Sequence, residues 1–132
     1  MSFATARRDI EKRLDSNWAL TQIAYDNVPF TPPKDQSWIS LRIFEDDVRR
    51  VNIGNPGVHR VSGTISISLY SPENTGTKEI RENADLLADI FRDKQFNGIT
   101  CREASLSTGI LKDGWYMMIL SIPFYWDGVY SA

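Results

Sequence analysis

The stretch from Trp38 to Tyr70 limits the possible folds most tightly, because it predicts two β-strands. Apolar residues alternate with polar ones along the second strand, Arg60 to Tyr70. The apolar positions are Val61, Gly63, Ile65, Ile67 and Leu69, and the polar positions are Arg60, Ser62, Thr64, Ser66 and Ser68. A slip of one residue would turn every apolar side chain outward, so the register of this strand is strongly specified.

Roughly Glu45 to His59 separates the two strands and is predicted to be a long, polar hairpin loop. It is longer than a hairpin needs, and long ordered loops are more often functional surfaces than simple connections. We therefore expect this loop to contact a partner through its charged residues. The candidate interface residues are Glu45, Asp46, Asp47, Arg49, Arg50, His59 and Arg60.

The size and composition of the chain predict one globular domain over residues 1–132. Its 15 basic and 17 acidic residues give a net charge of −2, which argues against general electrostatic binding of nucleic acid. A single cysteine, Cys101, excludes an internal disulfide and favours a reducing compartment. The first 13 residues hold no apolar secretory segment, and no apolar run is long enough for a membrane span.

Two helices are predicted on either side of the Trp38–Tyr70 strands. The first runs from Ser2 to about Trp18, with an apolar stripe at every fourth residue, and the second from about Thr77 to Gln95, with Gly98 as its stop. The stripe positions are Ala6, Ile10, Leu14 and Trp18 in the first helix, and Ile80, Ala84, Leu87 and Phe91 in the second. Further strands are expected at Thr21–Val28, Ile99–Leu106 and Trp115–Trp126. This order predicts an α+β fold, with an antiparallel or mixed sheet packed by two helices.

The last predicted strand, Trp115–Trp126, is apolar on both faces. One helix layer covers one face of a sheet, so the second face requires another element or another subunit. Pro123 lacks a backbone donor and predicts an edge or a bulge at that position. An apolar strand at an exposed edge is a hazard in a monomer, so the pattern favours an oligomer.

No residue pattern in the chain indicates catalysis, a cofactor or a metal site. His59 is the one histidine and lacks the nucleophile and acid of a catalytic triad, and Cys101 falls in strand-like sequence. The consecutive acids Glu45–Asp47 offer oxygen ligands, but the calcium-loop spacing is missing, so a solvated or interfacial patch is predicted. The glycines of Asn52–Gly57 lack the lysine and helix of a phosphate-binding loop and predict a turn.

The order of the predicted segments, and the pattern of apolar and polar residues in each, resemble those of a known family. The segments are a leading amphipathic helix, the WISLRIFEDD strand, the HRVSGTISISLYSPENTGT strand and turn, the NADLLADIFRDKQF helix and the closing GWYMMILSIPFYWD strand. The whole pattern is similar to the tail terminator, or tail completion, proteins of long-tailed bacteriophages, among them the phage lambda minor tail protein U.

This resemblance implies a structural virion protein of the tail or neck, assembled in the host cytoplasm. Such a subunit forms a ring, usually a hexamer, on the end of the tail tube, stops its polymerisation and offers its other face to head-completion proteins. DNA passes through the lumen without being read. Three other readings stay open: a head-closure protein, a tail tube subunit, and a small enzyme or ligand-binding module.

Overall fold

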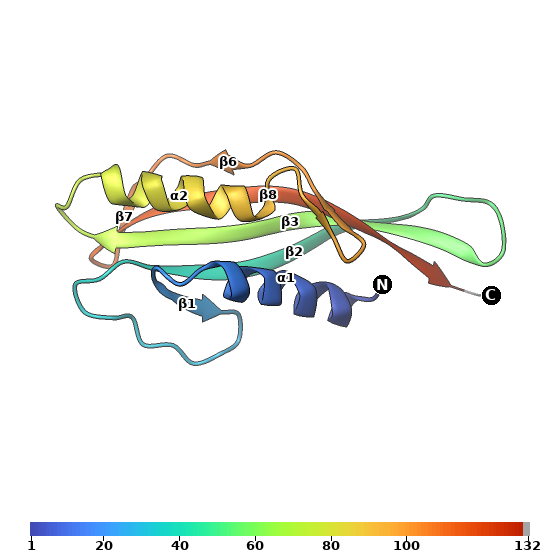
Figure 1. Cartoon of the computed structure of the whole chain (residues 1–132), viewed down its shortest axis with the longest axis horizontal. Coiled ribbons are helices and arrows are strands. Elements are labelled where there is room, and N and C mark those ends of the chain that lie inside the picture. The colour runs from blue at the N-terminus through green and yellow to red at the C-terminus, as the bar shows by residue number, and fades with distance from the viewer. Residues whose placement is uncertain (131–132) are drawn as a thin grey trace.

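The computed structural model describes residues 1–130 as one mixed β-sheet with two helices (Figure 1). The elements in chain order are α1 (Phe3–Asn17), β1 (Gln22–Tyr25), β2 (Trp38–Arg50), β3 (Gly57–Pro72), α2 (Lys78–Phe91), β4 (Gln95–Phe96), β5 (Ile99–Cys101), β6 (Ser105–Leu106), β7 (Ile110–Lys112) and β8 (Trp115–Tyr130). The predicted α+β class is confirmed.

The sheet follows the order β1-β2-β3-β8-β5-β4, with β6 and β7 also paired to β8. All pairs are antiparallel except β1 and β2, which run parallel. A parallel connection needs about a dozen residues, and residues 26–37 supply it. The sheet is therefore mixed, and its three long strands β2, β3 and β8 form the centre.

Both helices pack on the same face of the sheet (Figure 1). Every predicted stripe residue of α1 and α2 is buried in the core beneath them. Ser2 caps α1 through a reciprocal pair of hydrogen bonds: its hydroxyl accepts from the Thr5 amide, and the Thr5 hydroxyl accepts from the Ser2 amide. The helix-facing positions of β3 alternate with half-buried ones as predicted, so burial of one face fixes its register.

The segment after α2 differs from the prediction. The helix ends at Phe91 rather than Gln95, because Gln95 and Phe96 leave it to pair with β5. Gly98 does not stop the helix. Asn97 and Gly98 have φ values of 47° and 83° and form the two-residue turn between β4 and β5, a conformation that favours glycine.

The second face of β8 is covered at one end by the chain's own aromatic residues. Trp38 stacks on Tyr70 with ring centroids 3.9 Å apart, and Trp115 meets Trp38 edge-on at 5.8 Å. Phe30, from the 26–37 connection, lies 5.1 Å from Trp38 on this cluster. Beyond the cluster this face presents the serine and threonine side chains of β3. The chain's own aromatic residues therefore cover this face at the Trp115 end.

Pro123 lies where the strands beside β8 are interrupted. β5 pairs with β8 up to Phe124 and β6 from Ser121, which leaves Pro123 between them. Its carbonyl accepts from the Arg102 amide at 2.8 Å, in the break between β5 and β6. The missing N–H of Pro123 therefore faces an irregular segment, as the predicted edge or bulge required.

Candidate assembly surface

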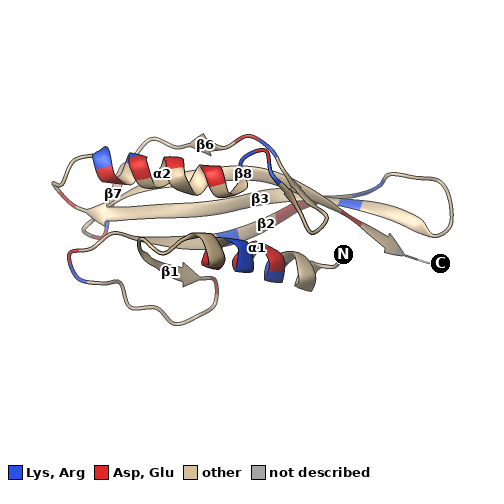
Figure 2. Ribbon diagram, viewed as in Figure 1, with Lys and Arg blue, Asp and Glu red and all other residues tan. Residues whose placement is uncertain are grey.

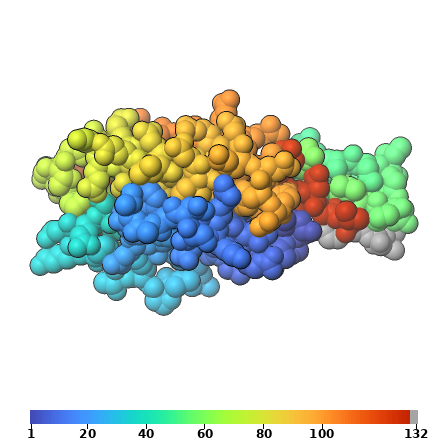
Figure 3. Space-filling view, in the orientation of Figure 1, coloured from blue at the N-terminus to red at the C-terminus, as the bar shows by residue number. Residues whose placement is uncertain are grey.

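A three-stranded arm projects from the helix-covered body (Figures 1 and 3). We define the arm as β2 from Glu45 to Arg50, the turn 51–56, β3 from Gly57 to Gly63, and β8 from Phe124 to Tyr130. Neither helix covers its outer part, as the green and red segments at one end of Figure 3 show. The predicted loop at Glu45–His59 is thus wrong in extent. The charged residues lie there on the paired strands β2 and β3. β8 continues four residues beyond Trp126 and pairs with β3 along the arm.

A β-bulge marks the root of the arm. Glu45 lies opposite Gly63 and Asp47 lies opposite Ser62, so Asp46 is an extra residue on β2. A Cβ atom on Gly63 would lie 1.8 Å from the carbonyl oxygen of Phe44. The bulge therefore requires glycine on the partner strand, and it lets the arm twist away from the body.

Basic and acidic segments both lie on the arm (Figure 2), and most of the predicted interface charges bind groups of the arm itself. The Arg49 guanidinium lies 3.0 Å from the Asp47 carboxylate. Arg50 donates to the carbonyls of Asn52, at 2.7 Å, and Gly54, and so holds the turn at the arm's tip. Arg60 forms two hydrogen bonds, 2.9 and 3.1 Å long, to Asp127 on β8. These three arginines stabilise the arm's own shape.

The other predicted interface residues lie on the same arm. Glu45 borders a hollow at the arm's root, and partial burial raises the pKa of its carboxyl. His59 lies on β3, half-buried, between Arg50 and Gly128 on the neighbouring strands. Asp46 is exposed at the bulge. The fold thus brings all seven residues together, while their role as an interface stays a prediction.

Exposed apolar side chains on the arm were missed by the sequence analysis. Ile53 at the tip is fully exposed, and Val48 is 56% exposed. Among the side chains that the structure describes on and beside the arm, the exposed large apolar residues are Phe44, Val48, Val51, Ile53 and Val129. Residues 51–58 carry no charge at all. An exposed apolar tip on a projecting arm is typical of a surface that a partner covers.

The other residues considered for chemistry are ordinary structural groups. Cys101 is buried, and burial raises the pKa of its thiol to about 12, so it stays protonated and unreactive. Among residues 1–130, no three histidine, cysteine or acidic side chains gather as a metal site. In the same range, no helix has the length and apolarity of a membrane span.

The Arg60–Asp127 pair predicts a pH-dependent arm. Hydrogen bonding from Arg60, together with its charge, lowers the pKa of Asp127. Because the pKa of Asp127 is lower in the folded than in the unfolded chain, the ionised carboxylate stabilises the fold above the unfolded pKa of about 4. This stabilisation is lost as the pH falls through the lowered folded-state pKa. We expect Asp127→Asn to lower the Tm slightly at pH 7, because the pair is partly exposed and screened. The difference should shrink as the pH falls below about 4 and through the lowered pKa of Asp127. A difference that stays the same over this pH range would contradict it.

The fold and the surface together define a class: a small α+β domain with a projecting, partly apolar arm. A family model for phage tail terminator proteins matches residues 7–124, so this chain belongs to the phage tail terminator family. Eleven solved chains match it in fold. One of them covers 100% of this chain and 99% of its own, with a TM-score of 0.71 and 19% sequence identity, which shows a shared fold. No curated protein sequence matches significantly.

Family membership fixes the broad role of the protein. It is a structural component of a bacteriophage tail, in a family whose members act in contact with tail and head proteins of the virion. The recognition that the sequence pattern suggested is confirmed at the level of this family.

Proposed function

We propose that copies of this protein form a closed ring, of six subunits as the resemblance implies, on the end of the tail tube. The ring ends polymerisation of the tube and offers its opposite face to head-completion proteins. DNA passes through its lumen without sequence-specific contact. The observation that carries this proposal is the arm, whose apolar tip projects beyond the helices and has no cover within the described chain.

The arm supplies the contacts in this proposal. Its tip, with Val51 and Ile53 exposed, reaches the end of the tube. Its charged residues, Glu45 to Asp47 with Arg49, Arg50, His59 and Arg60, set the shape and polarity of the surface around that tip. Burial of apolar side chains supplies affinity, while the charges select the orientation of the partner.

The test is the length of tails made without the protein, measured by electron microscopy. We expect overlong tails, because nothing then stops the tube. Unattached heads beside tails of normal length would instead identify a neck protein. Purified protein that forms closed rings, and not growing tubes, would exclude the alternative that the chain is a tail tube subunit.

A point variant tests the arm's part in capping. Supplying Ile53→Asp in place of the natural protein is expected to give overlong tails, because a carboxylate at the tip opposes burial. The matched control is Leu20→Asp, since Leu20 is 65% exposed but lies on the body. Normal tails with Ile53→Asp would remove the tip from the proposal.

A further inference from the structure

The outer edge of β7, and that of β2 over most of its length, have no described strand beside them. β1 pairs only with Trp38–Leu41, so no described strand lies against the outer edge of β2 from Arg42 to Arg50. On the opposite side of the sheet β7 pairs only with β8, and no described strand borders its outer edge. Unpaired edges present backbone donors and acceptors that another strand can satisfy.

Both edges also carry exposed apolar side chains. Phe44 and Val48 on β2 are 41% and 56% exposed. Ile110 and Leu111 on β7 are 52% and 67% exposed. An apolar edge strand exposed to water is a liability that proteins normally cover or charge. β7 carries only the charge of Lys112, whereas charged residues are frequent along Arg42–Arg50, so β7 is the edge that most needs a covering strand.

The directions of the strands make the two edges complementary. β3 is antiparallel to β2, β8 is antiparallel to β3, and β7 is antiparallel to β8. β7 therefore runs opposite to β2. β7 lies level with Trp38, where β1 covers β2. When two copies lie in the same orientation and are displaced along the strands, β7 of one meets the free edge of β2 of the next as an antiparallel pair. The alternation of directions in the central sheet then continues from copy to copy.

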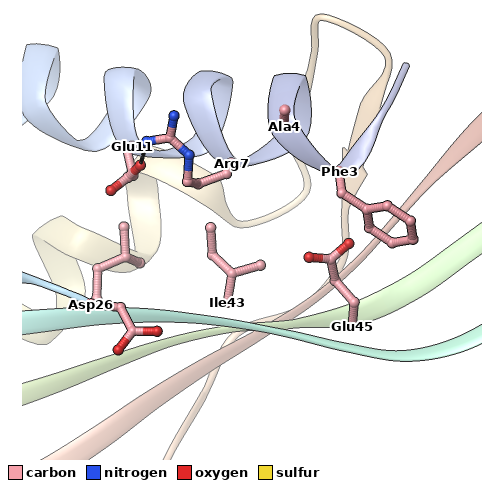
Figure 4. Close-up of a pocket in the computed structure, with 8 residues that line it drawn as sticks. Phe3, Ala4, Arg7, Glu11, Asp26, Ile43 and Glu45 are labelled. Carbon is pink, nitrogen blue, oxygen red and sulfur yellow. Dashed lines mark hydrogen bonds and ion pairs between the residues drawn. The ribbon is translucent and has the colours of Figure 1, made fainter.

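A hollow beside the β2 edge matches the side chain that β7 would bring. It is about 390 Å³ in volume and lies between α1 and β2, next to where β1 ends (Figure 4). Phe3, Leu41 and Ile43 give it apolar walls, and four charged side chains also line it: Arg7, Glu11, Asp26 and Glu45. Leu111 pairs with Tyr116, a residue packed against the core, so it lies on the helix side of the sheet, as the hollow does. Its exposed side chain would be buried there.

The charges on the β2 edge oppose a two-fold dimer. Asp46 is central in Arg42–Arg50, so antiparallel self-pairing about that centre would set Asp46 against Asp46 and Glu45 against Asp47. Like charges directly opposite each other destabilise a strand pair. In that register the acidic run disfavours β2 with itself, whereas Lys112 brings an opposite charge to it from β7.

We infer that the outer edge of β2 in one copy pairs antiparallel with the outer edge of β7 in the next, head to tail. The inference rests on the proposed ring and names the contact that builds it. Repetition of one heterologous contact closes a ring when the rotation between copies closes. All arms then point to the same side of the ring, so their tips together face one partner.

Blocking each edge in turn tests this pairing by mass measurement in solution. We expect Val48→Lys and Leu111→Lys each to abolish closed rings, because lysine on an edge prevents strand addition. Both side chains are more than half exposed, so the fold should persist, which circular dichroism checks. Leu20→Lys is the control and should form rings like the natural chain.

Mixing the two blocked variants gives the decisive result. Val48→Lys keeps an intact β7 edge, and Leu111→Lys keeps an intact β2 edge. An equal mixture should therefore form dimers and nothing larger. Rings from Leu111→Lys alone, or a mixture that stays monomeric while the natural chain forms rings, would overturn the inference.

Disulfide trapping covers the case in which free chains associate weakly. Phe44→Cys, Asp46→Cys and Val48→Cys are each mixed with Leu111→Cys under oxidising conditions at high protein concentration. We expect at least one mixture to give far more mixed dimer than a mixture with Leu20→Cys. Cys101 stays silent because it is buried and protonated. No excess in any mixture would overturn the pairing.

The two proposals fail in different experiments. Rings that persist with a blocked β7 edge, together with overlong tails in the absence of the protein, would refute the edge pairing and keep the capping function. Tails of normal length in its absence would refute capping, whatever the edge variants show.

Discussion

Gly63→Ala is expected to lower the stability of the protein by about 3 kcal/mol, the upper end of the usual range for overpacking. The added Cβ would lie 1.8 Å from the backbone oxygen of Phe44 and 3.0 Å from the Cα of Glu45. Backbone atoms cannot move aside as the end of a flexible side chain can. The bulge must therefore open, and the pairing of β2 with β3 at the arm's root is lost with it.

Thermal unfolding followed by circular dichroism measures this effect. A loss of about 3 kcal/mol corresponds to a fall in Tm of roughly 10 °C for a chain of this size. Gly54→Ala is the matched control, because its Cβ would meet only the Asn52 side chain, at 3.6 Å. Equal Tm values for the two variants would show that the bulge adapts and that glycine is not required there.

Trp126→Ala is expected to cost about 3–5 kcal/mol, the usual loss for a large aromatic residue in a core. Trp126 is fully buried at the junction of the arm and the body. It pairs with Val61 on β3 and Ile99 on β5, and the Phe3 ring of α1 meets it edge-on at 5.4 Å. Its removal would leave a cavity between three elements and free the arm's root.

Denaturant unfolding compares this variant with Trp126→Phe. The indole N–H of Trp126 has no hydrogen-bond partner among the described residues, so phenylalanine removes an unsatisfied donor while it keeps most of the ring. We expect Trp126→Phe to lose much less stability than Trp126→Ala. Similar losses would mean that the indole itself, rather than its volume, holds the junction together.

The sequence does not predict the effects expected at Gly63 and Trp126, although it predicts much of the fold. The apolar stripes of α1 and α2 predicted both helices, and the alternation along β3 predicted which side chains are buried. Periodicity succeeds in such elements because one face is buried against one layer. It failed at Gly98 and at Gln95, where pairing with β5 overrides helix propensity.

The sequence predicted where the candidate interface residues lie but not what they contact within the chain. It placed six of them on the segment between the strands and Arg60 at the start of the next strand, and the fold keeps the seven together. It indicated charge as the means of contact, but Arg49, Arg50 and Arg60 bind groups of their own arm. Asp127 lies 67 residues from Arg60 in the chain, so only the pairing of β3 with β8 brings them into contact.

The sequence by itself determined the α+β class, the register of β3, the helix-facing core and the resemblance to tail terminators, because each depends on patterns local to a segment. Only the tertiary structure decided that the supposed loop is an arm and that the chain's own aromatic residues cover one end of the second face of β8. It also decided that the outer edges of β7 and of β2 beyond Leu41 have no described strand beside them. These features depend on which strands become neighbours. Contacts between distant segments set that order, and no local periodicity records it.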